Sequence, residues 1–583
     1  MLFHLLLGTV ALGTVALADT TSLPSTVEVN GTAFTWKGAV AYGELVPTVP
    51  DLDGYSLGGL GSAIAVKRWR SNGDGTYSGT IVAQPDRGHN TVELENFGAR
   101  HQLIEFTLRP CMEETCNTDA AAPSLELTYT GIQKYIDASP RNQNGEVTSG
   151  LDAVNIRPAA DGFPVLPEVE NGNNALSTDM EGIALMADGT FWSSDEYGPT
   201  IYHIGADGII LGAIMPPDAF LPHNEAGELD FSVESDIVSG RATNQGFEGL
   251  TINPDNTRLY ALLQSALMQD QNVEDEVSVE NTRMLVYDIS TPSAPTLIEE
   301  YVVVLPKSDS KVFASSEVHY VKDGLFMVLA RDGKGNGNGD SPSSEASKKQ
   351  LTSNFKDIGL VSLAGATNIV GLYDDVGASV APNGVLDAAV TPATFNEFIN
   401  MIDDAQLARF GLHNGKPTDR DLVGKWEALA IAPVLDVNFP DDFFIFTAAD
   451  NDFISTAEWV DGVNTGPDPY ESDVPNAFFV YRVTLPGAEY PTYLLDQSLN
   501  PSGLARRRIP RSLCPGQSQC SLGGGRWECI DVSSNLEQCG ACANDQGVDC
   551  TALPGVAGVV CVQGTCVVES CEVDRDLVDG ACL

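Results

Sequence analysis

The sequence predicts an all-β chain, in which a β-propeller is followed by a small disulfide-rich module. Three observations lead to this prediction: a strand-opening motif recurs along the chain, Asp-Gly turns separate paired apolar runs, and ten of the twelve cysteines lie near the C-terminus. Hydrophobic residues make up 43% of the 583 residues, so the chain is long enough to bury several cores.

Residues 1–18 have the features of a secretory signal peptide. An apolar run ends in the small-residue pattern Ala16-Leu17-Ala18 and is too short to span a membrane. We therefore expect a secreted, extracellular protein. Asn30-Gly31-Thr32 is a sequon for N-glycosylation, which this compartment permits.

A short motif opens successive strands of the main domain, which we place at residues 30–500. It consists of a large apolar residue, Glu, a small residue, an aliphatic residue and another small residue. The copies are MEGIA at 180–184, FEGLT at 247–251 and WEALA at 426–430, with a looser copy, SEVHY, at 316–320 and an acid-free one, LGGLGSAI, at 57–64. In chain order, the three middle copies, which begin at 180, 247 and 316, are about 67 to 70 residues apart.

Each motif copy starts an apolar run that turns back as a second one. Asp188-Gly189 and Asp323-Gly324 are typical of tight hairpin turns. Repeated three- and four-stranded units of this kind predict a β-propeller. We expect six blades, with five or seven as alternatives, and with the remaining strands at 30–50 and 120–170. A large β-sandwich is the second choice of fold.

One segment of the main domain has a different pattern. Thr391 suits a helix N-cap, Pro392 the first helical position, and apolar residues follow at spacings of three and four. This pattern predicts a helical insertion at about residues 391–411, ending near Gly411.

The cysteines predict a stapled C-terminal module at residues 514–583. Ten cysteines in this segment of a secreted chain favour five disulfides, and Cys111 should pair with Cys116. Cys539-Gly-Ala-Cys542 has zinc-knuckle spacing, but residues 514–583 contain no His, so disulfides are favoured. The basic linker at 501–513 contains Arg506, Arg507, Arg508 and Arg511, and is either an exposed linker or a processing site.

Hairpin geometry brings acidic residues of different repeats together. The first strand of a blade lines the channel and the second runs back, so the residue before the first strand and those after the second share one face. The resulting rim combines Glu181 with Asp195 and Glu196, and Glu427 with Asp450 and Asp452. Buried carboxylates repel one another unless they are protonated, paired with Arg, or bound to a hard cation.

Oxygen-rich sites suit Ca²⁺, or less often Mg²⁺. The expected metal ligands are Glu181, Asp195, Glu248, Glu317, Glu427, Asp450 and Asp452. The alternative is that each Glu opens its strand structurally, by accepting hydrogen bonds from backbone N–H groups.

Catalytic candidates at the same rim are Arg87, His89, Glu196, His319 and Arg331. Arginine forms bidentate bonds to phosphate or carboxylate, although its ordinary role here is to pair a rim acid. Either His is a candidate general acid or base, although a lone His is more often a structural residue. The sequence contains no GxSxG, HExxH or Walker motif.

The formal charge of −48 excludes most anionic partners. Such a surface repels nucleic acid and anionic membranes, so we expect neither as a partner. An anionic substrate requires a bound cation or local Arg residues.

Several segments of the main domain resemble the phytase-like family, described as having esterase-like activity of phytase. The segments are LGGLGSAIA, PDRG at 85–88, DMEGIALMADGTFWSSDEYGPTIYHIGADG, NQGFEGLTINPDNTRLYALLQS, ARDGKG and KWEALAIAP at 425–433. The resemblance covers roughly residues 57–455. It implies rim carboxylates that hold Ca²⁺, which in turn binds substrate phosphate. The tail resembles cysteine-rich modules of secreted fungal proteins.

Two functions from different classes follow from these observations. The first is a secreted, metal-assisted phosphoesterase or esterase that acts on a small-molecule ester or phosphate ester at the channel mouth, with lactones as a variant substrate. The second is a non-catalytic propeller that binds a ligand or the cell wall, with the cysteine-rich tail as its anchor.

Overall fold

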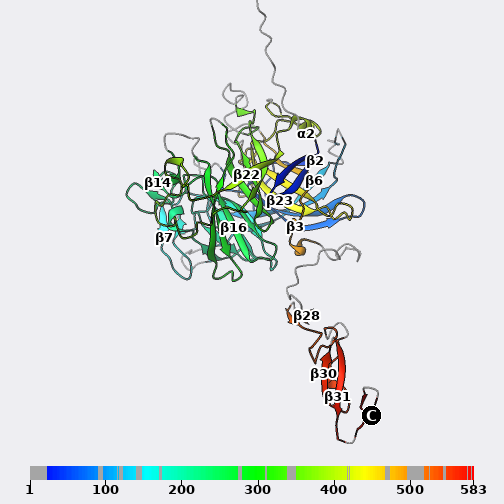
Figure 1. Cartoon of the computed structure of the whole chain (residues 1–583). Helices are drawn as coiled ribbons and strands as arrows, with labels where there is room; N and C mark the ends of the chain where they lie inside the picture. Colours follow the sequence, from blue (N-terminus) through cyan, green and yellow to red (C-terminus); the bar gives the residue numbers. More distant parts are fainter. Residues whose placement is uncertain are drawn as a thin grey trace, which may run out of the picture. The chain divides into compact units, whose positions relative to one another are not determined.

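The chain folds into two compact units, Met1–Gln497 and Ser498–Leu583, in the computed structural model. The structure describes residues 23–495 and 518–582, with gaps at 89–95, 114–115, 117–122, 139–147, 170–173, 273–278, 309–310, 338–349, 416–417, 419, 467–472, 524–525, 543–546, 563, 574 and 579–580. The expected signal peptide, His89 and the basic linker lie outside the described residues. Strands dominate the described parts, and helices are few and short (Figure 1).

Five antiparallel sheets build the first unit. The first has the order β3 (Ala63–Ser71), β4 (Tyr77–Gln84), β5 (Arg100–Leu108), β6 (Leu125–Lys134). The second has the order β9 (Met180–Leu185), β10 (Phe191–Asp195), β11 (Ile201–Ile204), β12 (Ile210–Ile214). The third has the order β15 (Phe247–Ile252), β16 (Arg258–Leu263), β17 (Asn281–Asp288), β18 (Thr296–Val304).

The last two sheets depart from this simple pattern. The fourth has the order β19 (Ala314–Lys322), β20 (Leu325–Arg331), β21 (Lys356–Ser362), β22 (Ala393–Asn400). Its outer strand β22 pairs in parallel with β18 and so joins the third sheet. The fifth has the order β23 (Lys425–Pro433), β24 (Asp442–Asp450), β27 (Asn476–Thr484), β2 (Thr32–Leu45), β1 (Ser25–Val29), so both ends of the unit meet in one sheet.

The innermost strands contact one another in cyclic order. β3 contacts β9, β9 contacts β15, β15 contacts β19, β19 contacts β23, and β23 contacts β3. A cavity of about 80 Å³ is lined by three consecutive residues from each strand: 64–66, 183–185, 250–252, 318–320 and 429–431. The five sheets therefore surround one central space.

The segment after β27 covers one end of this cavity. The Tyr493 hydroxyl donates to the Leu185 carbonyl over 2.8 Å, and the Glu489 amide donates to the Val321 carbonyl over 2.8 Å. Both acceptors lie at the ends of their inner strands, next to the hairpin turns. The acidic motif residues lie at the opposite ends of the same strands.

The Asp-Gly turns form as the sequence predicts. Gly189 has a φ of 92°, which a residue with a Cβ adopts only under strain, and the Asp188 carboxylate accepts the Thr190 amide over 3.0 Å. Gly324 has a φ of 70° in the equivalent turn between β19 and β20. These turns fix the register of the two strands in each hairpin. The motif residues therefore lie at the end of the hairpin opposite the turn.

In the described residues, five sets of four or five strands surround the cavity, where six blades are the first expectation and five is an alternative. The strands expected to supply a further unit are used elsewhere. β2 pairs with β27, and β6 is the fourth strand of the first sheet. Residues 155–157 and 166–168 form only a two-stranded sheet.

The predicted helix over 391–411 is wrong for most of its length. Residues Ala393–Asn400 form β22, and the α-helix α2 covers only Asp404–Ala408. The exposed edges of β18 and β21 both pair with this segment, so tertiary pairing overrides its helical spacing. Asp403, not Thr391, is the N-cap, and its side chain accepts from the amides of Ala405 and Gln406.

Short elements fill the connections of the first unit. The strands are β7 (Asn155–Arg157), β8 (Leu166–Glu168), β13 (His223–Asn224), β14 (Ile237–Ser239), β25 (Glu458–Val460) and β26 (Val463–Gly466), and the 3-10 turns are η1 (Asp218–Phe220), η2 (Met268–Asp270), η3 (Pro382–Gly384) and η4 (Thr492–Leu494). No helix of the described residues is long and apolar enough to cross a membrane.

The second unit consists of hairpins held by disulfides. Its elements are β28 (Ser518–Gly523), β29 (Arg526–Ile530), η6 (Cys550–Ala552), β30 (Val556–Val562), β31 (Thr565–Cys571), β32 (Leu577–Val578) and β33 (Ala581–Cys582). The described disulfides are Cys520–Cys542, Cys539–Cys561, Cys550–Cys566 and Cys571–Cys582. The local pairing of Cys111 with Cys116 is confirmed.

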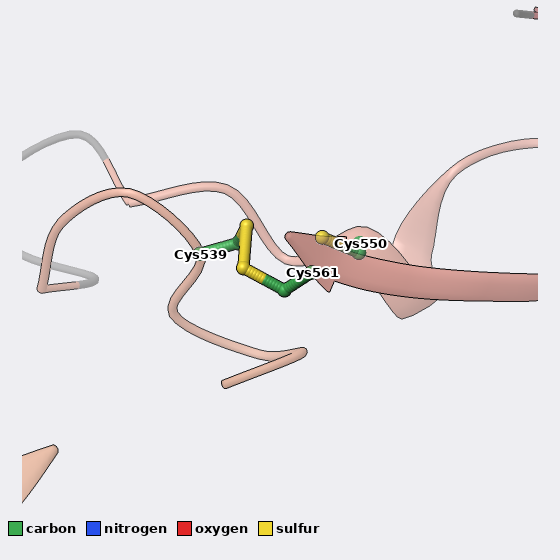
Figure 2. Close-up of side chains that lie close together, drawn as sticks. All are labelled: Cys539, Cys550 and Cys561. Atoms are coloured by element: carbon green, nitrogen blue, oxygen red, sulfur yellow. A yellow bond between two sulfur atoms is a disulfide. The ribbon is translucent and has the colours of Figure 1, made fainter. Parts of the chain in front are cut away.

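The sulfurs of Cys539, Cys550 and Cys561 lie within 4.8 Å of one another, which is a spacing that metal sites also have. Figure 2 shows the sulfur–sulfur bond between Cys539 and Cys561, and Cys550 is bonded to Cys566. Because a thiolate is the metal ligand, these oxidised sulfurs do not form a zinc site.

Trp69 joins the first sheet to the fifth. Its indole is fully buried, stacks on Tyr77 with ring centres 4.9 Å apart, and meets the edges of Phe444 and Phe446. Its Nε1 donates to the Pro433 carbonyl over 2.8 Å.

We expect Trp69→Ala to lower the free energy of unfolding by about 3–5 kcal/mol, because it leaves a cavity at the contact between two sheets. Val463→Ala, at a 61% exposed strand position, should change it by less than about 0.5 kcal/mol. Denaturant unfolding followed by tryptophan fluorescence and circular dichroism measures both. A loss below about 1 kcal/mol for Trp69→Ala would show that the two sheets do not depend on this contact.

Candidate functional site

A β-bulge places a glutamate at the start of three inner strands. On β15, Phe247 pairs with Leu263 and Gly249 with Leu262, so Glu248 is the extra residue. Glu427 is the extra residue on β23, and the register of β9 breaks around Glu181. Bulges commonly redirect side chains at functional sites. Here they take the glutamates out of the regular ladder.

The fourth copy of the motif differs by one residue. On β19 the bulge falls between Ser315 and Glu317, so Ser316 occupies the position of Glu248. The sequence motif aligns Glu317 with Glu248, and this alignment is wrong. The sheets instead bring the apolar residues that line the cavity into equivalent positions. The equivalent positions, each two residues before the cavity lining, are Ser62, Glu181, Glu248, Ser316 and Glu427.

Glu317 consequently has a backbone role. Its Oε1 accepts from its neighbour's amide, Val318 N, over 2.9 Å and from Leu250 N over 3.1 Å. This is the structural strand-opener arrangement, and it ties β19 to β15. Glu317 does not belong to any of the carboxylate clusters described below.

Glu181, Glu196 and Glu248 form the first carboxylate cluster. They come from β9, from the residue after β10, and from β15, and one oxygen of each lies within 4.8 Å of the others. Their exposed fractions are only 4%, 1% and 4%. Gln264 donates to Glu248, and Glu196 Oε1 has no hydrogen-bond partner among the described residues. Among the described residues these three groups have no salt bridge within 4.0 Å, although the charges of Arg87 and Arg241 act on Glu196 and those of Arg331 and Lys425 act on Glu248.

A second cluster, Asp86, Asp450 and Asp452, is neutralised by a lysine. Lys425 Nζ contacts Asp450, lies 2.6 Å from Asp452 Oδ1 and lies 3.7 Å from Asp86 Oδ2. Lys425 is also 3.7 Å from Glu427, which forms an ion pair with Arg331. This side of the rim therefore has its own cations.

Asp179 connects the two clusters. Asp86, Asp179 and Glu181 also approach within 4.8 Å, and Arg87 Nε lies 3.1 Å from Asp179 Oδ2. The Arg87 guanidinium lies 4.0 Å from the ring centre of Tyr197 and is buried. Arg87 thus pairs with a rim acid, which is the structural role given above as the alternative to substrate binding.

Asp195 fixes the loop that presents Glu196. Its carboxylate accepts the Asp179 amide over 2.9 Å and the Gly198 amide over 2.6 Å. Both oxygens are therefore used by the backbone, and Asp195 supports the first cluster without joining it.

His319 lies in the central cavity, two residues after Glu317 on β19. Its Nδ1 lies 2.9 Å from the Tyr320 carbonyl, and burial lowers its pKa to about 4. The imidazole is therefore neutral near pH 7 and lies away from the carboxylates.

Burial dominates the electrostatics of the rim. It raises the pKa of Glu248 to about 8, with Glu427 adding to the effect and Arg331 opposing it. Burial and Glu248 raise the pKa values of Glu181 and Glu196 well above their usual range. Near Lys425, by contrast, the pKa of Asp450 rises only to about 6. Burial thus favours the neutral, protonated form of these acids, and binding of a cation would require their deprotonation.

Comparison with known proteins assigns the chain to a family. The phytase-like family, described as esterase-like activity of phytase, matches residues 59–453, which contain all three carboxylate clusters. The chain belongs to the phytase-like family. A protein of Arthroderma benhamiae, named an uncharacterized secreted protein, is 33% identical over 485 residues, covering 75% of this chain and 91% of its relative.

The tail has a separate match. Residues 527–577 match the CPL1-like family, described as protein CPL1-like. With the secreted relative and the disulfides, this establishes a secreted phytase-like protein with a cysteine-rich module.

Similarity to solved structures is weak. A luciferin-regenerating enzyme is 10% identical, covers 77% of this chain and 97% of its own, and has a TM-score of 0.27. The allergen Mala s 1 of Malassezia sympodialis is 10% identical, covers 75% and 96%, and has a TM-score of 0.25. Scores this low carry no inference.

The phytase-like segments already contained the residues that motif reading missed. Asp179 and Lys425 each stand two positions before a motif glutamate, in DME and KWE. Residues two apart on an extended chain point to the same side, so both belong with Glu181 and Glu427. Asp86 stands next to Arg87 in PDRG and was visible as a hairpin end.

We expect Glu248→Gln to become increasingly stabilising relative to wild type as the pH rises from 5 to 8 in chelator. The folded pKa of Glu248, about 8, exceeds the unfolded value of 4.5, so its stabilising contribution is full below the unfolded value and is lost as the pH rises through the folded one. The difference in Tm between variant and wild type measures this.

Asp323→Asn is the control, because the Asp323 side chain is 87% exposed and the substitution changes the net charge by the same amount as Glu248→Gln. Its Tm difference should stay flat over the same interval. A flat difference for Glu248→Gln as well would contradict the proposed protonation of the cluster.

Proposed function

We propose that the five sheets are the blades of a β-propeller. Its acidic mouth, the end of the channel where the carboxylate clusters lie, holds a divalent cation, with Ca²⁺ as the preferred ion. This cation assists hydrolysis of a phosphate ester or another ester. The cyclic contacts of the inner strands and the cavity they enclose support the propeller. Family membership supports the ester class of substrate.

The convergence of Glu181, Glu196 and Glu248 carries the metal proposal. Three buried carboxylates within 4.8 Å of one another repel strongly, and no described cation pairs with them. Their oxygen-only donor set suits Ca²⁺ or Mg²⁺. A cation held there would supply charge neutralisation and Lewis-acid polarisation of an ester oxygen.

Arg331 and Lys425 are the residues best placed to receive the anionic part of a substrate. Their side chains are 14% and 18% exposed, whereas that of Arg87 is 2% exposed. Both already pair with rim carboxylates, which hold the cationic groups in fixed positions. We assign them the positioning of phosphate or carboxylate.

The burial of the same cluster also favours a second candidate function. A cation enclosed by side chains that are 1–4% exposed suits a structural metal in a non-catalytic binding propeller. The two functions differ in whether any ester is turned over.

The deciding assay measures phosphate release from phytate and from simple phosphate monoesters, and acid release from carboxylic esters, with Ca²⁺ and with a chelator. Hydrolase function requires turnover that the chelator removes and Ca²⁺ restores. Ca²⁺ binding without turnover of any ester would favour the binding propeller.

We expect Glu181→Gln, Glu196→Gln and Glu248→Gln each to weaken Ca²⁺ binding at least about tenfold, since each removes a charged ligand (~1.4 kcal/mol per factor of ten). Isothermal titration calorimetry measures the affinity. Glu317→Gln is the matched control, because its carbonyl oxygen still accepts the two backbone amides, and it should change affinity less than about twofold. Equal affinities in all four variants would remove this cluster as the site.

We expect Arg331→Lys to raise KM for a phosphate monoester roughly tenfold with a smaller change in kcat, because Lys keeps the charge but loses the bidentate geometry. Steady-state kinetics measures both constants. Arg258→Lys is the control, since Arg258 is a partly exposed arginine outside the rim. An unchanged KM for Arg331→Lys would exclude substrate contact by this side chain.

A further inference from the structure

A groove of about 420 Å³ lies away from the acidic mouth. It is bordered by the turn between β1 and β2, by β16 and β18, and by the turn between β19 and β20. Since that turn is at the end of the hairpin remote from Arg331, the groove and the carboxylates are at opposite ends of the blade. Its volume is in the range that small ligands occupy, roughly 300–1,000 Å³.

The groove contains the only glycosylation sequon in the sequence, Asn30-Gly31-Thr32. Asn30 and Gly31 form the two-residue turn between β1 and β2, with φ of 49° and 73°. Asn30 is exposed, and its Nδ2 donates to Ser362 Oγ over 2.5 Å. Ser362 also lines the groove, so the amide is held facing it.

We propose that Asn30 carries an N-linked oligosaccharide whose first sugars lie in this groove. The protein is secreted, so Asn30 enters the compartment in which such sugars are attached. This inference is independent of the proposed function, because neither the sequon nor the groove contains a rim residue.

The attachment balances as a glycosyl transfer. The donor is a lipid-linked oligosaccharide diphosphate and the catalyst is the host oligosaccharyltransferase. A bond forms between Asn30 Nδ2 and the anomeric carbon of the first sugar, while the bond from that carbon to the diphosphate oxygen breaks. The lipid diphosphate leaves, and the amide gives up one proton to a base of the transferase.

The groove lining suits a sugar chemically. Tyr301 is partly exposed and offers a flat apolar surface to the C–H faces of a pyranose, whereas Phe34 and Tyr260, which also line the groove, are buried. Arg258 and Glu299, 3.8 Å apart at the same wall, provide donors and acceptors for hydroxyl and acetamido groups. This combination of rings and paired charges recognises a neutral, hydroxyl-rich ligand.

The first test is the mass of the full chain secreted from a eukaryotic host that installs high-mannose glycans. Endoglycosidase H should remove one oligosaccharide from denatured wild type and from Thr32→Ser, and none from Asn30→Asp or Thr32→Ala. Asp tolerates the positive φ at position 30, so the turn is retained. Absence of an oligosaccharide on wild type would overturn the proposal.

The second test compares endoglycosidase release from native and denatured protein. A seated glycan should be released at least about fivefold more slowly from native wild type, and Tyr301→Ala should remove most of this protection, as expected for loss of one aromatic contact. Tyr373→Ala, a partly exposed tyrosine that does not line the groove, is the control and should retain it. Equal release from native and denatured wild type, or protection that persists in Tyr301→Ala, would show that the sugars do not lie in the groove.

Discussion

Mutual repulsion of buried carboxylates is the constraint on which the acidic mouth depends. The inner strands contact one another in a ring, so the glutamate side chains at their bulges lie close together in one small volume. Desolvation there raises the free energy of every ionised acid, and where backbone N–H groups do not bind the acid, protons, fixed cations or a metal offset this cost. The distribution of these three remedies differs between the two sides of the ring.

The five equivalent positions at the starts of the inner strands explain this asymmetry. Glu181 and Glu248 occupy neighbouring strands, and with Glu196 they make a cluster that no described Arg or Lys pairs. Glu427, in contrast, stands between strands whose equivalent residues are Ser62 and Ser316, and it has Arg331 and Lys425 beside it. One side of the mouth thus has Arg331 and Lys425 in ion pairs with its acids, whereas the acids of the other side depend on protons or on a bound cation.

The sequence was informative where the pattern is local. Repeats of a strand-opening Glu followed by an aliphatic residue and a tight turn were sufficient to predict the hairpins and to bring Glu181, Glu196 and Glu248 to one end of their strands. Local pattern failed where tertiary pairing decides. The edge pairing of β22 replaced an expected helix, and a one-residue shift in the bulge of β19 removed Glu317 from the cluster.

Contacts across sheets were beyond reach from the sequence alone. The pairing of Arg87 with Asp179, or of Arg331 with Glu427, depends on distances between sheets that no spacing along the sequence specifies. The number of sheets could not be predicted from the sequence either, because the strands at both ends of the unit combine into one sheet. Nothing in residues 32–45 distinguishes them from the start of a separate sheet.

The shared fifth sheet has a consequence for biogenesis. Its strand β27, residues Asn476–Thr484, is the direct partner of both β24 and β2, and β2 begins at Thr32. During translocation the N-terminal hairpin must therefore wait for more than 400 residues of chain before its edge is paired. Throughout that interval an unpaired strand edge is open to wrong partners. A sugar attached early at the tip of that hairpin would make the waiting segment more soluble, precisely while it has no sheet to join.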